Sequence, residues 1–349
     1  MTMMTNLFPL ITRAGLLLLL LGCTAAWAGA ASPAFAESSS PRWEGSGPVP
    51  NPSLASPLYA ITHFDNAQSD STPYGPPAGT FPIVPIAQPV VCGGPINIMT
   101  FASPDKDYLW VVGTSHVGYV SIADGNFFLL ASYEALAEST GGILAPIPEE
   151  NFRSFGKASA VGMNVSVMNE TLSELFGPHY DARFKNGFYS VVDNENVLYS
   201  DFGGDLYAFT LTDPADPAAG ITRRSVIRDV ITTIQGEEYP AGTRLFGLSM
   251  TYDGHLIITF SNGIAVIDRN LDPATASLYR FGEGEFLTNA PAVDEKNGIY
   301  VASDTIMRKI VWDGTTLSDD EADGAWSCPY PQSEQPPIIK VGAGTGSSP

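Results

Sequence analysis

The sequence predicts an all-β domain made of repeated antiparallel sheets. Short apolar runs rich in β-branched and aromatic residues alternate with turn residues along a chain of 349 residues that contains 34 Gly and 28 Pro. Helical periodicity is confined to two stretches, residues 132–137 and 166–175. A unit of strand, acidic turn, strand, Gly-containing turn and strand also occurs four times.

Residues 1–36 are typical of a secretory signal, with one charge, Arg13, before an apolar run too short to span a bilayer. Two cleavage sites are possible. Leu20-Leu21-Gly22-Cys23 has the form of a bacterial lipobox, which would make Cys23 the lipidated first residue, whereas cleavage after Ala34-Phe35-Ala36 would discard Cys23 with the leader. Both predict export, as a periplasmic protein or outer-membrane lipoprotein or, alternatively, as a secreted protein. Residues 37–53, rich in Ser, Pro and Gly, are predicted to form a flexible linker.

The repeated unit defines a domain over residues 54–349. Its four copies place three strands each at residues 96–102, 108–112 and 118–123; 188–192, 197–200 and 205–211; 245–251, 255–260 and 263–267; and 290–293, 299–302 and 307–312. The equivalent turn residues Asp105, Asp193, Asp253 and Asp294 are 88, 60 and 41 residues apart. A blade of four antiparallel strands takes about 40 to 50 residues. The longest spacing therefore fits either two blades or one blade with an insertion over residues 138–180, and the pattern predicts a β-propeller of four to six four-stranded blades.

Two stretches carry a family resemblance. Residues 290–303 (Ala-Pro-Ala-Val-Asp, then Gly-Ile-Tyr-Val-Ala-Ser) and residues 198–209 (Leu-Tyr-Ser, then Gly-Asp-Leu-Tyr-Ala-Phe) resemble blades of the quinoprotein-like propeller superfamily, whose repeats are called PQQ-like. The His- and Asp-containing residues 63–71 are similar to the lead-in before the first blade of exported members. The resemblance implies a fold far more than an activity.

The tryptophans depart from that superfamily. Its quinone-binding dehydrogenases close each blade with a Trp after Thr-Gly, but the three Trp of this domain, Trp110, Trp312 and Trp326, stand in other contexts. A bound quinone, and with it a quinone-dependent oxidoreductase, is therefore the least favoured of the functions considered.

The last residues, 344–349, resemble the approach to another first strand, as Asn289-Ala290-Pro291 does before the strand at Ala292. This pattern predicts that the complete protein continues for one or more blades. The alternative is a flexible tail on a small closed ring.

Charge and cysteine content limit the partners and suggest one covalent link. The formal net charge of −20 repels phosphate backbones and anionic headgroups, so no nucleic acid is expected and the membrane is reached only through a lipid anchor. In an oxidising compartment Cys92 and Cys328 are able to form a disulfide that ties the start of the domain to its end, and the alternative is two buried thiols.

The histidines are the first candidates for chemistry. His63 lies with Asp65 and Asp70 in the densest polar cluster, His116 lies in a turn between strands, and His179 lies in the insertion, so His63, Asp65, His116 and His179 are the candidate catalytic residues. A latch that closes the ring is the alternative role for the His63 cluster. His255 follows the Asp253-Gly254 turn and is expected to be structural.

No cofactor is predicted, although calcium is a possibility at one acidic run. Residues 319–324 put acids at the first, third and fifth positions of a calcium loop and Gly at the sixth, but the twelfth position is Tyr330 instead of the bidentate Glu. No two histidines have local metal spacing. Motifs of the Gly-x-Ser-x-Gly, His-Glu-x-x-His and Gly-Lys-Ser/Thr kinds are also missing from the sequence.

The favoured function is therefore an exported cell-envelope propeller that acts as a scaffold for an unidentified small molecule or envelope protein. The alternative is a propeller enzyme, such as a lactonase-like hydrolase, a lyase or a transferase, with polar residues around a central channel.

Overall fold

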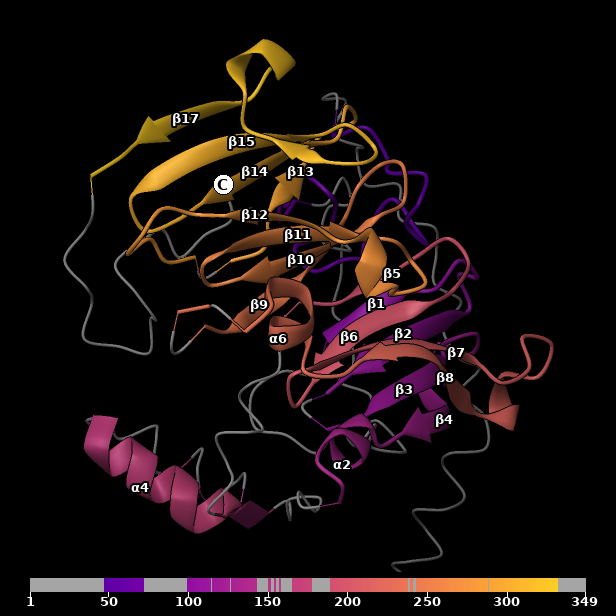
Figure 1. Ribbon diagram of the computed structural model, residues 1–349. Helices are drawn as coiled ribbons and strands as arrows, with labels where there is room; N and C mark the ends of the chain where they lie inside the picture. The colour runs from indigo at the N-terminus through magenta and orange to yellow at the C-terminus, as the bar shows by residue number, and fades with distance from the viewer. Residues whose placement is uncertain are drawn as a thin grey trace, which may run out of the picture. The chain divides into compact units, whose positions relative to one another are not determined.

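Four antiparallel sheets dominate the structure, a computed structural model (Figure 1). It describes residues 47–71, 99–113, 115–125, 127–142, 165–177, 189–237, 239–240, 243–287 and 289–331, with residues 150, 151, 154 and 157. The all-β prediction is confirmed. The predicted leader with Cys23, most of the linker and residues 332–349 lie outside the described residues.

Each sheet is a meander in which consecutive strands pair side by side. Sheet 1 contains β1 (Met99–Ala102), β2 (Tyr108–Val112), β3 (Val117–Ser121) and β4 (Phe128–Tyr133). Sheet 2 contains β5 (Val191–Val192), β6 (Leu198–Phe202), β7 (Asp205–Leu211) and β8 (Ile221–Ile227). Sheet 3 contains β9 (Leu245–Met250), β10 (Leu256–Phe260), β11 (Gly263–Ile267) and β12 (Ser277–Arg280). Sheet 4 contains β13 (Ala292–Val293), β14 (Gly298–Ala302), β15 (Ile306–Trp312) and β16 (Leu317–Ser318), and β17 (Trp326–Pro329) also pairs with β15. The four predicted units correspond to these four sheets.

The helices lie in connections between strands. Between β4 and β5 the described residues form α2 (Ala135–Ser139) and α4 (Val165–Phe176), with further helical residues at 150, 151, 154 and 157. The helix expected at residues 132–137 starts later, because residues 132 and 133 extend β4. A third helix, α6 (Val230–Gln235), follows β8, and its N-cap residue Asp229 accepts a hydrogen bond from the Thr232 amide. No helix among the described residues is long and apolar enough to cross a bilayer.

An Asp-Pro-Ala sequence marks the connection between the third and fourth strands of sheets 2 and 3. It begins one-turn helices η1 (Pro217–Ala219) and η2 (Pro273–Thr275), while η3 (Glu321–Asp323) follows β16. Asp216 and Asp272 accept a hydrogen bond from the amide two residues on, and the proline occupies the first helical position, where no amide hydrogen is needed. The repeat is visible in the sequence, and each copy lies between the end of a third strand and the start of a fourth.

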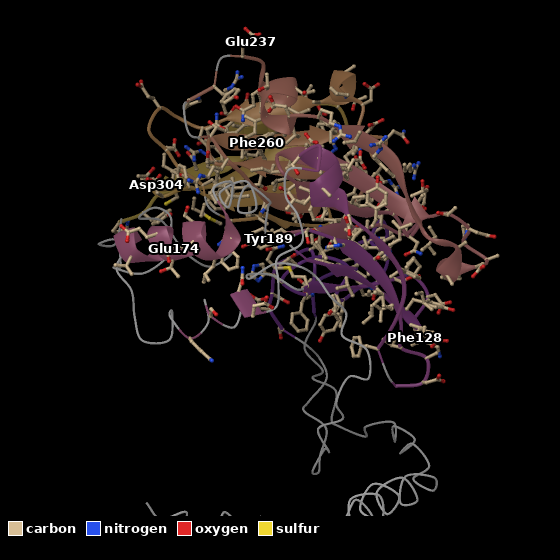
Figure 2. The ribbon with its side chains drawn as sticks, turned by 90° about the horizontal axis from the view of Figure 1, so that it is seen from below. Phe128, Glu174, Tyr189, Glu237, Phe260 and Asp304 are labelled. Carbon is tan, nitrogen blue, oxygen red and sulfur yellow. The ribbon has the colours of Figure 1, made fainter. Side chains whose placement is uncertain are left out.

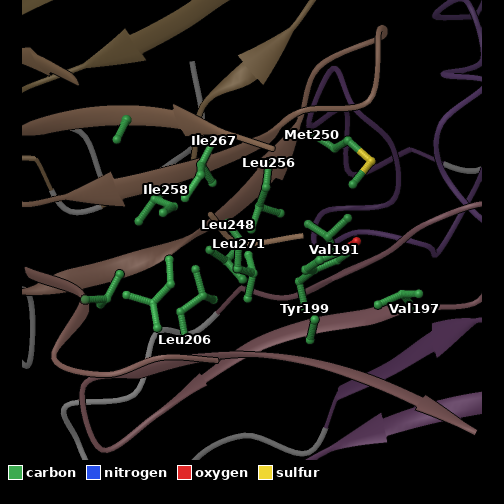
Figure 3. Close-up of a cluster of buried hydrophobic side chains, with 14 of the residues drawn as sticks. Val191, Val197, Tyr199, Leu206, Leu248, Met250, Leu256, Ile258, Ile267 and Leu271 are labelled. Carbon is green, nitrogen blue, oxygen red and sulfur yellow. The ribbon is translucent and has the colours of Figure 1, made fainter. Parts of the chain in front are cut away.

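Apolar side chains fill the space between neighbouring sheets. One cluster joins sheets 1 and 2, a second joins sheets 2 and 3 (Figure 3), and a third joins sheets 3 and 4. In the second cluster, Tyr199 and Leu206 of sheet 2 pack with Leu248, Leu256 and Ile258 of sheet 3. Contacts between first strands follow the same order, from β1 to β5, β5 to β9 and β9 to β13.

The turns after the first strands of sheets 2 and 4 add polar contacts to the preceding sheet. Asn196, with a φ of 62°, accepts hydrogen bonds from Trp110 Nε1 at 2.8 Å and Ser103 Oγ at 3.1 Å, both in or beside sheet 1. Its counterpart Asn297, with a φ of 61°, accepts from the Tyr252 amide of sheet 3 at 2.7 Å. Asn tolerates this left-handed backbone, so one residue makes the turn and also links two sheets.

Candidate functional site

Residues 51–71, named here the lead-in segment, contact the first strands of all four sheets. Ile61 forms an isolated antiparallel bridge with Val191 on β5. The hydrogen bonds run from Ala102 N to Tyr59 O (2.7 Å), Ala55 N to Val192 O (3.0 Å), Val192 N to Ala60 O (2.8 Å), Asn51 Nδ2 to Met250 O (3.2 Å) and Val293 N to Asn66 O (2.7 Å). The segment therefore joins β1, β5, β9 and β13, and it carries the predicted residues His63 and Asp65.

His63, Asp70, Tyr189 and Asn289 form the strand-start cluster, so named because Tyr189 precedes β5 and Asn289 precedes β13. His63 Nδ1 lies 2.8 and 2.9 Å from the two carboxylate oxygens of Asp70. The His63 ring lies 5.3 Å from the ring of Tyr189, which is labelled in Figure 2, and the Tyr189 hydroxyl donates to Asn289 Oδ1. Burial, with a smaller contribution from the charge of Asp70, raises the pKa of Tyr189 to about 12, so its hydroxyl stays protonated at neutral pH.

The cluster offers several hydrogen-bonding groups. When neutral His63 donates through Nδ1 to Asp70, its Nε2 is an acceptor. Asp70 is 59% exposed and the His63 side chain 27% exposed, so both reach solvent beside the nearly buried Tyr189 ring. These groups suit noncovalent binding of a polar ligand.

Asp65 does not join this cluster. It is 6% exposed, and its carboxylate accepts from the amides of Ala67 (3.0 Å) and Ser69 (3.2 Å) and from Ser69 Oγ (2.5 Å). With these local bonds made, Asp65 shapes the turn that follows His63.

His116 lies between β2 and β3 and makes a separate group. Ser115 Oγ is 2.6 Å from its Nδ1, and Glu134 Oε1 is 3.3 Å from its Nε2. Ser115 also accepts from the Leu136 amide through its carbonyl, which holds the turn against the start of α2.

His255 belongs to sheet 3, as expected of a structural histidine. Its Nδ1 lies 3.2 Å from Asp253 Oδ1, and its ring meets Trp312 of sheet 4 edge to face at 5.1 Å. Burial opposes the charged form of Asp253, but hydrogen bonds from Thr251, His255 and Trp312 and the nearby histidine outweigh it and lower the pKa.

His179 and Cys92 lie outside the described residues, so the predicted role of His179 and the predicted disulfide stay predictions. Cys328 is exposed on β17.

The acidic run at residues 319–324 uses its carboxylates separately. Asp319 accepts from the Tyr279 hydroxyl at 3.1 Å, Asp320 caps η3, and Asp323 accepts from Ser318 Oγ at 2.6 Å. No group of three or more His, Cys, Asp or Glu side chains arranged for a metal ion occurs in the described ranges.

Tyr189 and Asn289 were missed by sequence reasoning. Each precedes a two-residue first strand, and no motif marks either position. The only sequence signal is Gly247 on β9, where a Cβ would lie 2.6 Å from Tyr189 Cβ.

Comparison with known proteins adds little. No family model matches the chain. An uncharacterized protein of Archaeoglobus fulgidus is 31% identical over 117 residues, which cover 32% of this chain and 22% of that protein. The extracellular domain of a hybrid two-component system from B. thetaiotaomicron aligns with 63% of this chain and 22% of its own, at 14% identity and a TM-score of 0.33. The chain thus spans about a fifth of the length of each, and similarity at this level assigns no family.

Proposed function

We propose that this protein is an exported β-propeller of the cell envelope that binds a polar ligand or a partner protein without transforming it. Four successive antiparallel sheets, each with a four-stranded meander and the last with β17 as a fifth strand, have first strands that contact one another in chain order and so support the propeller. The leader-like residues 1–36 support export.

The separation of the histidines is the observation that favours binding over catalysis. An enzyme at the mouth of a channel would gather titratable side chains from several sheets. The three described histidines instead bond to different neighbours, His63 to Asp70, His116 to Ser115 and Glu134, and His255 to Asp253. The lead-in segment also occupies hydrogen-bonding groups of the first strands, which an open channel would leave available to a substrate.

Photo-crosslinking in the native envelope tests the binding role. A photoreactive phenylalanine analogue replaces Ser71, an exposed residue directly after Asp70 of the strand-start cluster, or Glu295, an exposed control in the turn at the opposite end of β13. We expect adducts from position 71 that are weakened by His63→Ala, and no comparable adducts from position 295. Equal labelling at both positions contradicts the proposed surface.

Intact mass of the exported protein tests the localisation. A mature chain beginning at a lipidated Cys23, or beginning at Glu37, supports export, while a chain that keeps residues 1–36 contradicts it.

A hydrolase is the second candidate because of one specific arrangement. Ser115, His116 and Glu134 line up as hydroxyl, imidazole and carboxylate, with the Ser115 Oγ only 2.6 Å from the ring. Ser115 is 6% exposed, which favours a structural role. Turnover of esters or lactones by the full-length protein that disappears in Ser115→Ala would establish the hydrolase and overturn the binding proposal.

A further inference from the structure

The space between sheets 3 and 4 holds a cluster of apolar side chains, and polar side chains lie on the same face of sheet 3. Ile257, Ile264 and Val266 of sheet 3 pack against sheet 4 in one hydrophobic cluster. Because paired residues and alternate residues share a face, the face that carries Ile257 also carries Ser249, its partner on β9, and the pair Gly247 and Thr259.

Two side chains on this face lack a hydrogen-bonding partner. Ser249 and Thr259 are 0% exposed, and neither hydroxyl has a partner among the described residues. Native interiors pair the great majority of such groups, because a buried hydroxyl that has lost water and gained nothing is destabilising.

Asn66 of the lead-in segment is bonded to the first strand of sheet 4. It is 2% exposed, and both Nδ2 and Oδ1 lack a partner in the described ranges. Its carbonyl accepts from the Val293 amide on β13, which packs on β9. Ser249 on β9 and Ala292 on β13 hold equivalent positions, because each stands one residue before the end of its strand. The backbone of Asn66 is bonded to the residue after Ala292, so it is fixed beside the strand that packs on β9.

The neighbours of this site are uncharged or already satisfied. Tyr189 lies over Gly247 and its hydroxyl is bonded to Asn289. The adjacent Asp65 carboxylate already accepts three hydrogen bonds from Ala67 and Ser69. That carboxylate is engaged within its own turn, whereas a neutral molecule that donates and accepts would satisfy an amide and two hydroxyls.

We propose that Asn66, Ser249 and Thr259 form a buried binding site for small neutral hydrogen-bonding molecules, either ordered water or one small polyol or amide. The occupant joins the lead-in segment to sheet 3 beside β13. This site is independent of the ligand surface proposed at His63.

The sign of a stability change tests the site. Thr259→Val and Ser249→Ala remove hydroxyls with little change of shape. If the hydroxyls bind an occupant, each variant shifts the unfolding equilibrium of the full chain about threefold to tenfold towards the unfolded state. If the two hydroxyls have no occupant to bind, each variant is as stable as the parent protein or more stable, and the proposal is overturned.

Thr251→Val is the matched control. Thr251 is also 0% exposed, but its hydroxyl donates to Asp253 at 2.5 Å and accepts from the His255 amide at 2.8 Å. The loss of stability in Thr251→Val measures the effect of removing a buried, hydrogen-bonded threonine hydroxyl. The loss in Thr259→Val is compared with that value.

A high-resolution crystal structure and native mass spectrometry separate the two sources. Density for water at the three side chains with no added mass identifies solvent, and a stoichiometric added mass identifies an organic ligand. Direct pairing of these side chains with protein groups, with nothing between them, refutes the site.

Discussion

Replacing Asp193 with alanine is expected to destabilise the protein by about 3 kcal/mol. Asp193 is 0% exposed and accepts from the amides of Glu195 and Val197, both at 2.9 Å, and from the Tyr199 hydroxyl at 3.0 Å. Arg269 of sheet 3 lies 3.4 Å from the same carboxylate. In the variant the Tyr199 hydroxyl keeps a second acceptor, the Arg269 carbonyl at 3.1 Å. The loss of stability therefore comes mainly from the Val197 amide, which is left buried without a partner at a cost of about 1–3 kcal/mol. The lost contact between the Asp193 carboxylate and Arg269 adds to it.

Asp294 gives a control with the same bonding pattern in a wetter place. Its carboxylate accepts from the amides of Lys296 (2.9 Å) and Gly298 (2.8 Å) and from the Tyr300 hydroxyl (2.9 Å), but the side chain is 24% exposed. Water is able to replace the lost carboxylate there, so Asp294→Ala should cost only about 1 kcal/mol.

Urea unfolding of both variants and the parent protein measures the difference. The reasoning depends on burial, because the hydrogen bonds of the two aspartates match. Equal losses for Asp193→Ala and Asp294→Ala, or a loss below about 1 kcal/mol for Asp193→Ala, would refute it.

Three further outcomes are expected. Gly247→Ala places a methyl group 2.6 Å from Tyr189 Cβ and should lower the free energy of unfolding by about 2 kcal/mol in the same assay. Gly47→Ala is the control, because the space around Gly47 is open, and it should change stability by less than about 0.5 kcal/mol. Similar values for the two variants would mean that Tyr189 does not pack against Gly247. Burial opposes ionisation of Glu285, but hydrogen bonds from Arg308 and Ser303 outweigh it and lower the pKa. Glu285→Gln should therefore be less stable than the parent protein at pH 7, and the difference in stability should narrow as the pH falls below 4.5. A difference that stays constant down to pH 3 contradicts this reasoning. The pKa of Tyr189 is raised from 10.0 to about 12, so the stability that its protonated hydroxyl contributes is complete below pH 10 and is lost as the pH rises towards 12. In Tyr189→Phe the stability should therefore fall less steeply at alkaline pH. An unchanged alkaline profile would count against the burial of the hydroxyl.

Local patterns in the sequence located most of the sheets. The period of apolar residues and the acidic turns at Asp193, Asp253 and Asp294 placed the second and third strands within a few residues of those observed. These signals are local, because a turn aspartate caps amides only two to four residues away. Asp65 caps amides two and four residues away in the same manner, although the sequence interpretation took it as a catalytic candidate.

The tertiary structure alone decided which polar residues meet. Tyr189 and Asn289 are 100 residues apart, and they bond across β9, because Tyr189 stands before β5, Asn289 stands before β13, and β9 contacts both of these strands. The burial of the Ser249 and Asn66 side chains depends in the same way on how sheet 3, sheet 4 and the lead-in segment come together. Sequence determined the strands, their turns and the all-β class, since these follow from short-range periodicity and capping. The strand-start cluster and the buried polar site arise from packing between segments far apart in the chain, for which a single sequence carries no periodic signal.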